Sequence, residues 1–212
     1  MVLRTAFIMA LLFCAAGGAA AQEHTGSLGL PHIDSTKAYI RVLGVTRSPI
    51  GWIQFCEEIP QDCVTQDRNE EVILTKTSYR ELLKINNEIN HTVQPMSDLE
   101  HYGVVEKWAY PDDGKGDCED YVLQKRRALL RRGWPMSALL ITVVRDHQNE
   151  GHAILTVHTN EGDLILDNMK DEILAWNETG YHFVKRQSQT DVNVWVSLPD
   201  NTGAEQAVAT GR

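Results

Sequence analysis

Two stretches of this sequence decide the fold: residues 116–133, GDCEDYVLQKRRALLRRG, and residues 151–168, GHAILTVHTNEGDLILDN. The first predicts a helix from about Asp117 to Arg132, because apolar residues recur along one side of it and a glycine follows it. The second predicts a β-hairpin, because two apolar segments flank the turn residues Thr159-Asn160-Glu161-Gly162.

The segments around these stretches predict a second helix and more strands. Apolar residues recur at helical spacing from Ser78 to Val93, and Ser78 and Glu81 have the spacing of a capping box. The apolar run from Ala138 to Val144 predicts a buried strand. Weaker patterns are interpreted as a strand at 37–45, a short helix from 52, and edge strands at 182–184 and 192–198. Two helices followed by antiparallel strands describe an α+β domain.

The N-terminal residues predict a cleaved secretory signal. Arg4 precedes an apolar run at 6–16, and three alanines at 19–21 provide a cleavage site. An uncleaved membrane anchor is the alternative, although the apolar run is short for a membrane span. We therefore interpret residues 1–21 as a signal peptide, 22–36 as a flexible linker, 37–199 as one domain and 200–212 as a disordered tail. The mature protein is expected in the periplasm, with no integral membrane segment.

Composition excludes some classes of partner. The 212 residues are 42% hydrophobic and 23% charged, as expected for a globular protein with a real core. The formal net charge of -9 argues against nucleic acid or anionic membrane as the main partner, since both favour an excess of Lys and Arg. The acidic balance fits cation binding and plain solubility equally well.

The cysteines divide into a candidate pair and a single thiol. Of the four cysteines, Cys14 lies within the predicted signal, so three remain in an oxidising compartment. Cys56 and Cys63 lie seven residues apart around Pro60 and could form a disulfide. That pairing would leave Cys118 as a free thiol, which in an exported protein indicates a function.

Cys118 is the candidate nucleophile. It lies at the start of the predicted helix, where the helix N-terminus stabilises a thiolate. Backbone amides at the same place can stabilise an oxyanion during acyl transfer. The alternative, a small buried hydrophobe or half of a disulfide, fits less well with the polar neighbours of this cysteine.

Two further residues complete the candidate triad. A nucleophilic cysteine needs a base, and the base needs a group that orients it. His152 opens the first strand of the predicted hairpin and Asp167 closes the second, so both are expected at the open end of the hairpin. His147 is the competing base, and His182 is a weaker competitor.

Acidic residues surround the candidate nucleophile. Asp117, Glu119 and Asp120 flank Cys118, and negative neighbours should raise the pKa of its thiol. They could cap the helix and complement its dipole. They could instead bind Ca²⁺, which prefers several oxygen ligands, although the spacing is not that of an EF-hand. Zinc is less favoured, because the sequence has no HExxH helix and no close pairing of Cys with His.

The blocks GDCEDY and GHA…LDN, in this order, resemble the bacterial transglutaminase-like cysteine proteinases. The similarity covers about residues 37–198 and includes TSYRELLKINNEIN at 77–90. It implies a papain/transglutaminase-like fold, with the nucleophile at a helix N-terminus packed on an antiparallel sheet. It also implies a Cys-His-Asp triad at Cys118, His152 and Asp167.

The same resemblance implies a cofactor and two partners. Calcium dependence is expected, with Asp117 and Glu119 as the best-matching ligands and Asp120 as a possible third. Proteases of this type cut a large surface adhesin near its N-terminus, and a membrane receptor that senses cyclic di-GMP sequesters them. The segment GWIQFCEEIPQDC at 51–63 departs from the pattern and suggests a subgroup with different targets.

Three functions stay open at this point. The first is a periplasmic endopeptidase that acts on a protein. The second is another papain-like acyl transfer, either on a cell-wall peptide or as transglutamination. The third is a non-catalytic binding module, which the complete triad disfavours. No wall-binding repeat is recognisable, and this favours a protein substrate.

Overall fold

The computed structural model of the chain describes residues 38–65 and 71–199. The predicted signal peptide, linker and tail lie outside the described residues. The helices are α1 (Ile50–Glu58), α2 (Lys76–Thr92), α3 (Asp98–His101) and α4 (Cys118–Leu130), with 3-10 turns η1 (Pro60–Cys63), η2 (Met136–Ala138) and η3 (Trp176–Glu178). Within the described ranges, no helix has the length and apolar character to cross a membrane.

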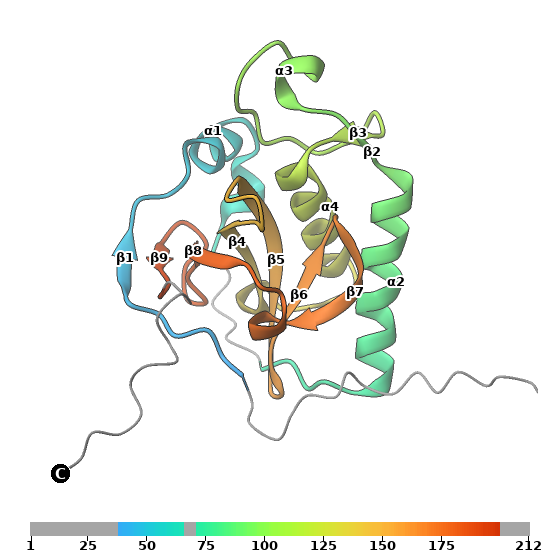
Figure 1. Cartoon of the computed structure of the whole chain (residues 1–212), viewed down its shortest axis with the longest axis vertical. Helices are drawn as coiled ribbons and strands as arrows, with labels where there is room; N and C mark the ends of the chain where they lie inside the picture. Colours follow the sequence, from blue (N-terminus) through green and yellow to red (C-terminus); the bar gives the residue numbers. More distant parts are fainter. Residues whose placement is uncertain (1–37, 66–70, 200–212) are drawn as a thin grey trace, which may run out of the picture.

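Seven strands form one antiparallel sheet (Figure 1). Its spatial order is β1-β9-β8-β4-β5-β6-β7. The strands are β1 (Gly44–Thr46), β4 (Leu139–Arg145), β5 (Gly151–Thr159), β6 (Gly162–Asp167), β7 (Lys170–Ala175), β8 (His182–Gln187) and β9 (Trp195–Ser197). A two-stranded parallel pair, β2 (Gln94–Pro95) with β3 (Lys115–Gly116), lies apart from this sheet. The α+β class is therefore confirmed.

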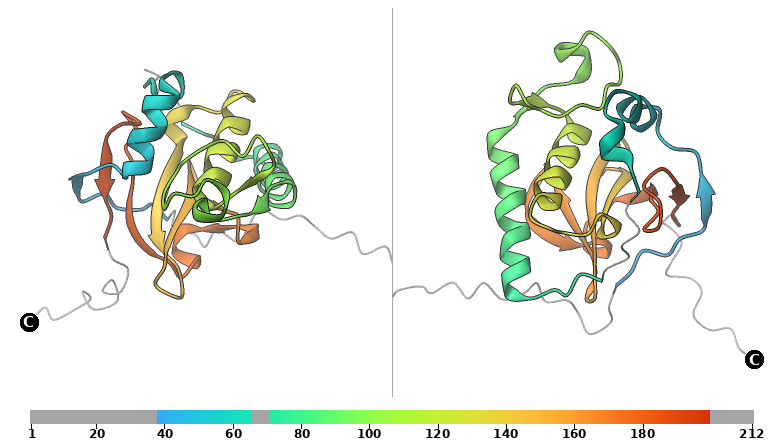
Figure 2. Two further views of the ribbon diagram at one scale, coloured as in Figure 1. Left: turned by 90° about the horizontal axis from the view of Figure 1, so that it is seen from above. Right: turned by 180° about the vertical axis from the view of Figure 1, so that it is seen from behind.

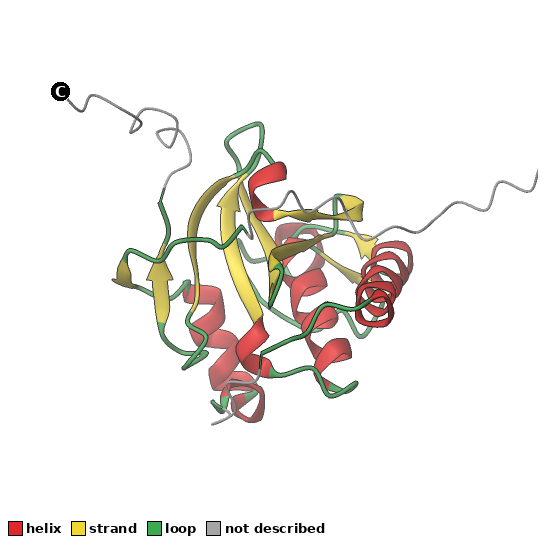
Figure 3. Ribbon diagram, turned by 90° about the horizontal axis from the view of Figure 1, so that it is seen from below, coloured by secondary structure: helices red, strands yellow, loops and turns green. Residues whose placement is uncertain are grey.

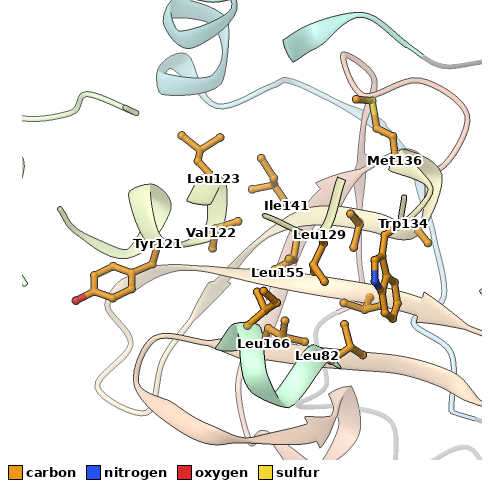
Figure 4. Packing of buried hydrophobic residues seen from close by; sticks show 14 of the residues in the cluster. Leu82, Tyr121, Val122, Leu123, Leu129, Trp134, Met136, Ile141, Leu155 and Leu166 are labelled. Atoms are coloured by element: carbon orange, nitrogen blue, oxygen red, sulfur yellow. The ribbon is translucent and has the colours of Figure 1, made fainter. Parts of the chain in front are cut away.

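Helices α2 and α4 cover one face of the sheet, as the views from below and from behind show (Figures 2 and 3). Alternate residues of the central strands point toward these helices, in agreement with the two-residue period of a strand. Leu155 and Leu166 of the sheet meet Leu82 of α2 and Leu129 of α4, all almost fully buried (Figure 4). This main core fixes the position of α4, and hence of Cys118, relative to β5.

A smaller apolar cluster lies on the opposite face of the sheet. It includes Ile154 and Ile165 from the strands, together with Ile40 from the N-terminal segment. Ala38 forms a parallel bridge with Gly162, whose φ of 121° and close approach to the Ala38 carbonyl both require a glycine. The N-terminal segment therefore belongs to the folded domain.

The hairpin prediction is confirmed. Thr159 pairs with Gly162 across the two-residue turn formed by Asn160 and Glu161. The helix predicted from Asp117 to Arg132 and the strand predicted from Ala138 to Val144 are also present, each with boundaries shifted by one or two residues.

Other expectations are wrong. The capping box of α2 is formed by Thr75 and Ser78, while Glu81 accepts a hydrogen bond from the Trp134 indole at 2.8 Å. Strand β8 pairs on both sides and β9 lies between β8 and β1, so neither is an edge strand. The edges are β1 and β7, and β1 includes only the end of the segment predicted as a strand at 37–45.

Candidate active site

Cys118 is the first residue of α4. Asp117 precedes the helix in an extended conformation, and its side chain makes no capping hydrogen bond. Asp117 is therefore the N-cap residue by position but makes no capping bond with its side chain, while Glu119 and Asp120 lie in the first turn, where they complement the helix dipole. Gly116 is required before Asp117, because a Cβ at this position would lie 2.6 Å from the Asp120 side chain. The close turn directs the start of α4 toward β5.

His152 and Asp167 form a buried hydrogen-bonded pair. His152 Nε2 lies 2.9 Å from Asp167 Oδ1, and the two residues are 7% and 3% exposed. Both lie on the sheet face of Ile154 and Ile165, so the diagonal cross-strand contact follows from the register of β5 and β6. The structure thus brings together two residues that the sequence placed at the open end of the hairpin.

Further hydrogen bonds orient the Asp167 carboxylate. Its Oδ1 also accepts the Met169 amide at 3.0 Å, and its Oδ2 accepts the Tyr181 hydroxyl at 2.7 Å. Burial raises the pKa of Asp167, but the hydrogen bonds and the charge of His152 outweigh it and hold the pKa below its usual value. Sequence analysis missed Tyr181, which lies after η3 in a segment without a recognisable motif.

A cavity of about 270 Å³ connects the cysteine with the His–Asp pair. Cys118, Glu119, His152 and Ala153 border it, and Glu106 and Trp108 line its other side. The backbone amide of Ala153 acts to lower the pKa of Cys118, in opposition to burial. The nucleophile and the base predicted from the sequence therefore border the same cavity.

The two competing histidines lie elsewhere. The His147 ring lies 5.2 Å from the Tyr181 ring, measured between centroids, and does not border the cavity. His182 pairs with Arg145 in the sheet and does not border it either. His152 is therefore the base that the geometry favours.

The Cys118 thiol donates a hydrogen bond to Glu119 Oε2 at 2.9 Å. Burial, followed by the negative charge of Glu119, raises the pKa of Cys118 well above its ordinary value. In this arrangement the cysteine is a protonated thiol.

Three acidic residues converge beside the nucleophile: Asp98, Asp117 and Glu119. One carboxylate oxygen from each lies within 4.8 Å of the others. Asp98 reaches this place because β2 pairs with β3, which aligns the start of α3 with the start of α4. The Asp98 amide then donates to Asp117 Oδ2 at 3.3 Å.

Asp120, the third ligand predicted from the sequence, lies outside this trio. Its Oδ1 accepts the Ala109 amide at 2.8 Å, which fixes the loop before α4. Its Oδ2 is buried without a hydrogen-bond partner among the described residues. The structure thus brings Asp117 and Glu119 together as expected, adds Asp98, and leaves the role of Asp120 as a ligand a prediction.

Burial raises the pKa of each of these acids, and the charges of neighbouring carboxylates raise the pKa of Asp117, Glu119 and Asp120 further. The pKa is about 6 for Asp117 and about 8 for Glu119 and Asp120, and that of Asp98 is also raised. Asp98 Oδ1 and Asp117 Oδ1 are buried and lack a hydrogen-bond partner within the described ranges. Buried oxygens of this kind fit a bound divalent cation, which would supply the missing positive charge.

The disulfide prediction is confirmed. Cys56, in α1, is bonded to Cys63, in η1, and Cys118 is a free thiol. The bond holds η1 against α1, and Pro49, directly before α1, borders the cavity. The segment that departs from the family pattern therefore lies next to the active site.

The fold and the site together define a cysteine peptidase of the papain/transglutaminase-like class. A family model described as bacterial transglutaminase-like cysteine proteinase BTLCP matches residues 42–203. The chain belongs to this family of cysteine proteinases.

Solved structures of Legionella pneumophila LapG are similar to this chain. One is 26% identical, covering 55% of this chain and 67% of that one, with a TM-score of 0.46. An EGTA-treated form is 24% identical, covering 59% and 73%, with a TM-score of 0.47. A calcium-bound form is 21% identical, covering 68% and 87%, with a TM-score of 0.49. No curated protein sequence matches this chain.

Proposed function

We propose that this proteinase is an exported, calcium-dependent endopeptidase that uses Cys118, His152 and Asp167 to cleave a surface protein such as a large adhesin. The observation that carries the proposal is the cavity that Cys118 and His152 share, with His152 hydrogen-bonded to Asp167 at 2.9 Å. A nucleophile, a base and an orienting acid are the parts that acyl transfer by cysteine requires.

In the first half of the reaction His152 accepts the thiol proton, and the Cys118 sulfur attacks the carbonyl carbon of the scissile peptide bond. The N-terminus of α4 stabilises the negative charge that develops on the carbonyl oxygen. His152 then donates its proton to the leaving amine as the C–N bond breaks, which leaves a thioester on Cys118. Asp167 keeps the imidazole oriented and stabilises its protonated form.

In the second half water attacks the thioester. His152 accepts a proton from the water, and the Cys118 sulfur leaves and regains a proton. The products are a carboxylate and the free enzyme. An amine in place of water would transfer the acyl group to that amine, and this transfer is transglutamination where the attacked carbonyl is that of a glutamine side chain and ammonia leaves.

The acidic trio supports the calcium part of the proposal. Asp98, Asp117 and Glu119 would hold the ion, because their oxygens converge and the Oδ1 atoms of Asp98 and Asp117 lack a hydrogen-bond partner within the described ranges. A bound Ca²⁺ would neutralise the carboxylates that keep the Cys118 thiol protonated. The pairing of Glu119 with the thiol makes this neutralisation relevant to catalysis.

The location and the partners are proposed on separate grounds. The disulfide between Cys56 and Cys63 supports export, because such bonds persist in oxidising compartments such as the periplasm. An adhesin substrate, and sequestration by a membrane receptor that senses cyclic di-GMP, extend the family resemblance to this chain. The acidic net charge of -9 gives no reason to expect nucleic acid as a partner.

Mutation of Cys118 to alanine tests the function. Incubation of the Cys118→Ala variant with the N-terminal region of an adhesin and excess Ca²⁺ should give no cleavage, while thermal unfolding stays close to that of the wild type. His152→Ala should be equally inactive, whereas the matched control His147→Ala should keep most of its activity, because His147 does not border the cavity. Cleavage by Cys118→Ala would rule out the proposed nucleophile, and mass spectrometry of the wild-type products would distinguish hydrolysis from transfer to an amine.

A further inference from the structure

The turn that follows Asp167 is fixed by two asparagines of α2. Asn90 Nδ2 donates to the Asp167 carbonyl at 2.9 Å and to the Lys170 carbonyl at 3.0 Å. Asn86 Nδ2 donates to the carbonyls of Lys170 and Asp171, at 2.8 and 3.1 Å. Because the turn begins at Asp167, helix α2 determines where the backbone of this residue lies.

A buried lysine of α4 is subject to the negative charges of the same segment. Lys125, in α4, is 0% exposed, and its Nζ has no hydrogen-bond partner among the described residues. It lies seven residues, or about two helical turns, after Cys118, so both side chains project from the same side of α4. The charges that act on it are those of Asp167, first, and Asp171. Helix α4 thus carries both the nucleophile Cys118 and the buried amine of Lys125, which interacts electrostatically with Asp167.

Packing alone does not account for this lysine. A buried amine without a hydrogen bond destabilises the folded state, whereas an apolar side chain of similar volume would fill the same space without that cost. The Oδ1 atoms of Asn86 and Asn90 are also buried and lack a partner among the described residues. The polar groups at this place are therefore costly for stability, and they converge on the segment that carries Asp167.

We propose that Lys125, Asn86 and Asn90 are positioning residues that fix the place and the charge balance of Asp167. The inference rests on the proposed function, because it assigns these residues a role behind the triad. The asparagines fix the backbone of Asp167 from one side. Lys125 supplies positive charge from the other side, which Asp167 needs when His152 has given up its proton.

The charged groups around Lys125 indicate when this charge is present. The charges of Asp167 in β6 and Asp171 in β7 act on Lys125; His152 is hydrogen-bonded to Asp167, and His91 lies 3.7 Å from the Asp171 carboxylate. Burial lowers the pKa of Lys125 to about 7, although both acids act in the opposite direction. The charge on Lys125 therefore changes within the pH range in which a periplasmic enzyme works.

Replacement of Lys125 by methionine separates positioning from packing. We expect Lys125→Met to unfold at the same temperature as the wild type or at a higher one. We expect kcat/KM to fall about tenfold, mostly in kcat, because misplaced catalytic groups slow the chemical step. The pH profile of kcat/KM should also be displaced, because a charge next to Asp167 has been removed. Lys84, an exposed lysine near the middle of α2, gives the matched control Lys84→Met, which should change none of these quantities.

The asparagines give a second test that does not depend on the folding of Lys125→Met. Asn90→Ala should lower kcat with little change in KM, because it frees the turn after Asp167. Asn87→Ala is the control, since Asn87 lies in the same helix and its Nδ2 bonds only to the Leu83 carbonyl, at 2.8 Å. If Lys125→Met does not fold, the comparison of Asn90 with Asn87 decides the proposal.

The results distinguish failure of this inference from failure of the proposed function. Wild-type kcat in Asn90→Ala would overturn the inference. The inference would also be overturned by a folded Lys125→Met variant whose pH profile of kcat/KM equals that of the wild type. This holds whether the activity of the variant is unchanged or has fallen in parallel with its thermal stability. Cleavage by Cys118→Ala in the same assay would instead overturn the proposed function.

Discussion

At the scale of single residues, the Asp167 carboxylate has the most demanding surroundings in the site. It accepts hydrogen bonds from His152, Met169 and Tyr181 while it is almost fully buried. A carboxylate with this many hydrogen-bond donors is ionised and held in one orientation. Loss of any of these donors would leave a buried charge with fewer hydrogen bonds and would destabilise the folded state. Replacement of Asp167 should therefore affect catalysis and acid stability separately.

The first effect concerns catalysis. Asp167→Asn keeps the shape of the side chain but removes the charge, and the amide favours the wrong tautomer of His152. We expect kcat to fall at least about a hundredfold, with KM little changed. Steady-state kinetics on an adhesin fragment measure this, and an Asn variant with more than about half of the wild-type kcat would show that Asp167 does not orient the base.

The second effect concerns stability against pH. Because the folded pKa of Asp167 lies below its unfolded value of about 3.9, the ionised group stabilises the folded protein above that pH. The contribution is lost as the pH falls through the folded pKa. Urea unfolding should therefore show that the free energy of unfolding of the wild type exceeds that of Asp167→Asn by a constant amount from pH 5 to 7. This difference should become smaller below pH 4. If the two free energies of unfolding differ by the same amount at pH 3 and at pH 7, the pKa of Asp167 is not lowered in the folded protein.

Asp98 tests the calcium proposal at the same scale. Ca²⁺ at about a hundred times its dissociation constant should stabilise the wild type by about 2.7 kcal/mol, or raise Tm by about 5–10 °C. Asp98→Asn should lose most of this increase, because one of three converging carboxylates is removed. The exposed Asp112, which pairs with Arg127, gives the control Asp112→Asn. A full calcium response in Asp98→Asn would exclude Asp98 as a ligand.

Asp98 also shows where sequence reasoning stops. Asp117, Glu119 and Cys118 are neighbours in the chain, so their shared chemistry can be recognised from residue types and from the start of a helix. Asp98 joins them through the short parallel pairing of β2 with β3. Two-residue strands have no periodic signal, and nothing near Asp98 in the sequence indicates that its partner lies nineteen residues away.

At the scale of elements, α2, α4 and the central hairpin could be predicted because their apolar residues recur with a clear period, whereas the four-residue helix α3 was not predicted. Strand β7 was not predicted, because Lys170, Asp171 and Glu172 at its start are polar and belong to an edge of the sheet. Strand β8 was predicted only over 182–184 and assigned to an edge. Its polar residues suggested exposure, whereas Arg186 and Gln187 are buried by tertiary contacts that no local pattern shows.

The disulfide between α1 and η1 allows a prediction at this scale. Closing a loop of this length should stabilise the folded state by about 2–3 kcal/mol, because it restricts the unfolded chain. The double variant Cys56→Ala/Cys63→Ala should lose that stability in urea unfolding. It should raise KM more than it lowers kcat, because Pro49 borders the cavity while no triad residue lies on α1. A larger loss in kcat than in KM would mean that α1 supports the triad itself.

At the scale of the whole molecule, the two faces of the sheet are covered very differently. Helices α2 and α4 pack on one face, and the other depends on a smaller cluster to which the N-terminal segment contributes (Figures 2 and 3). Ile40 is 4% exposed in this cluster, and its amide donates to the buried Asp163 carboxylate at 2.8 Å. Because Asp163 also binds His158, the N-terminal segment is joined to the hairpin that carries His152 and Asp167.

Truncation from the N-terminus tests this dependence and the predicted domain boundary together. A chain that starts at residue 37 should unfold like the mature protein, since the predicted linker ends at residue 36. A chain that starts at residue 42 loses the Ala38 bridge, the burial of Ile40 and its hydrogen bond, and should lose about 3 kcal/mol or more. Ile40→Ala should reproduce most of that loss without shortening the chain. Urea unfolding measures all three, and equal stability of the chains starting at 37 and 42 would mean that the second face of the sheet is stable without its N-terminal cover.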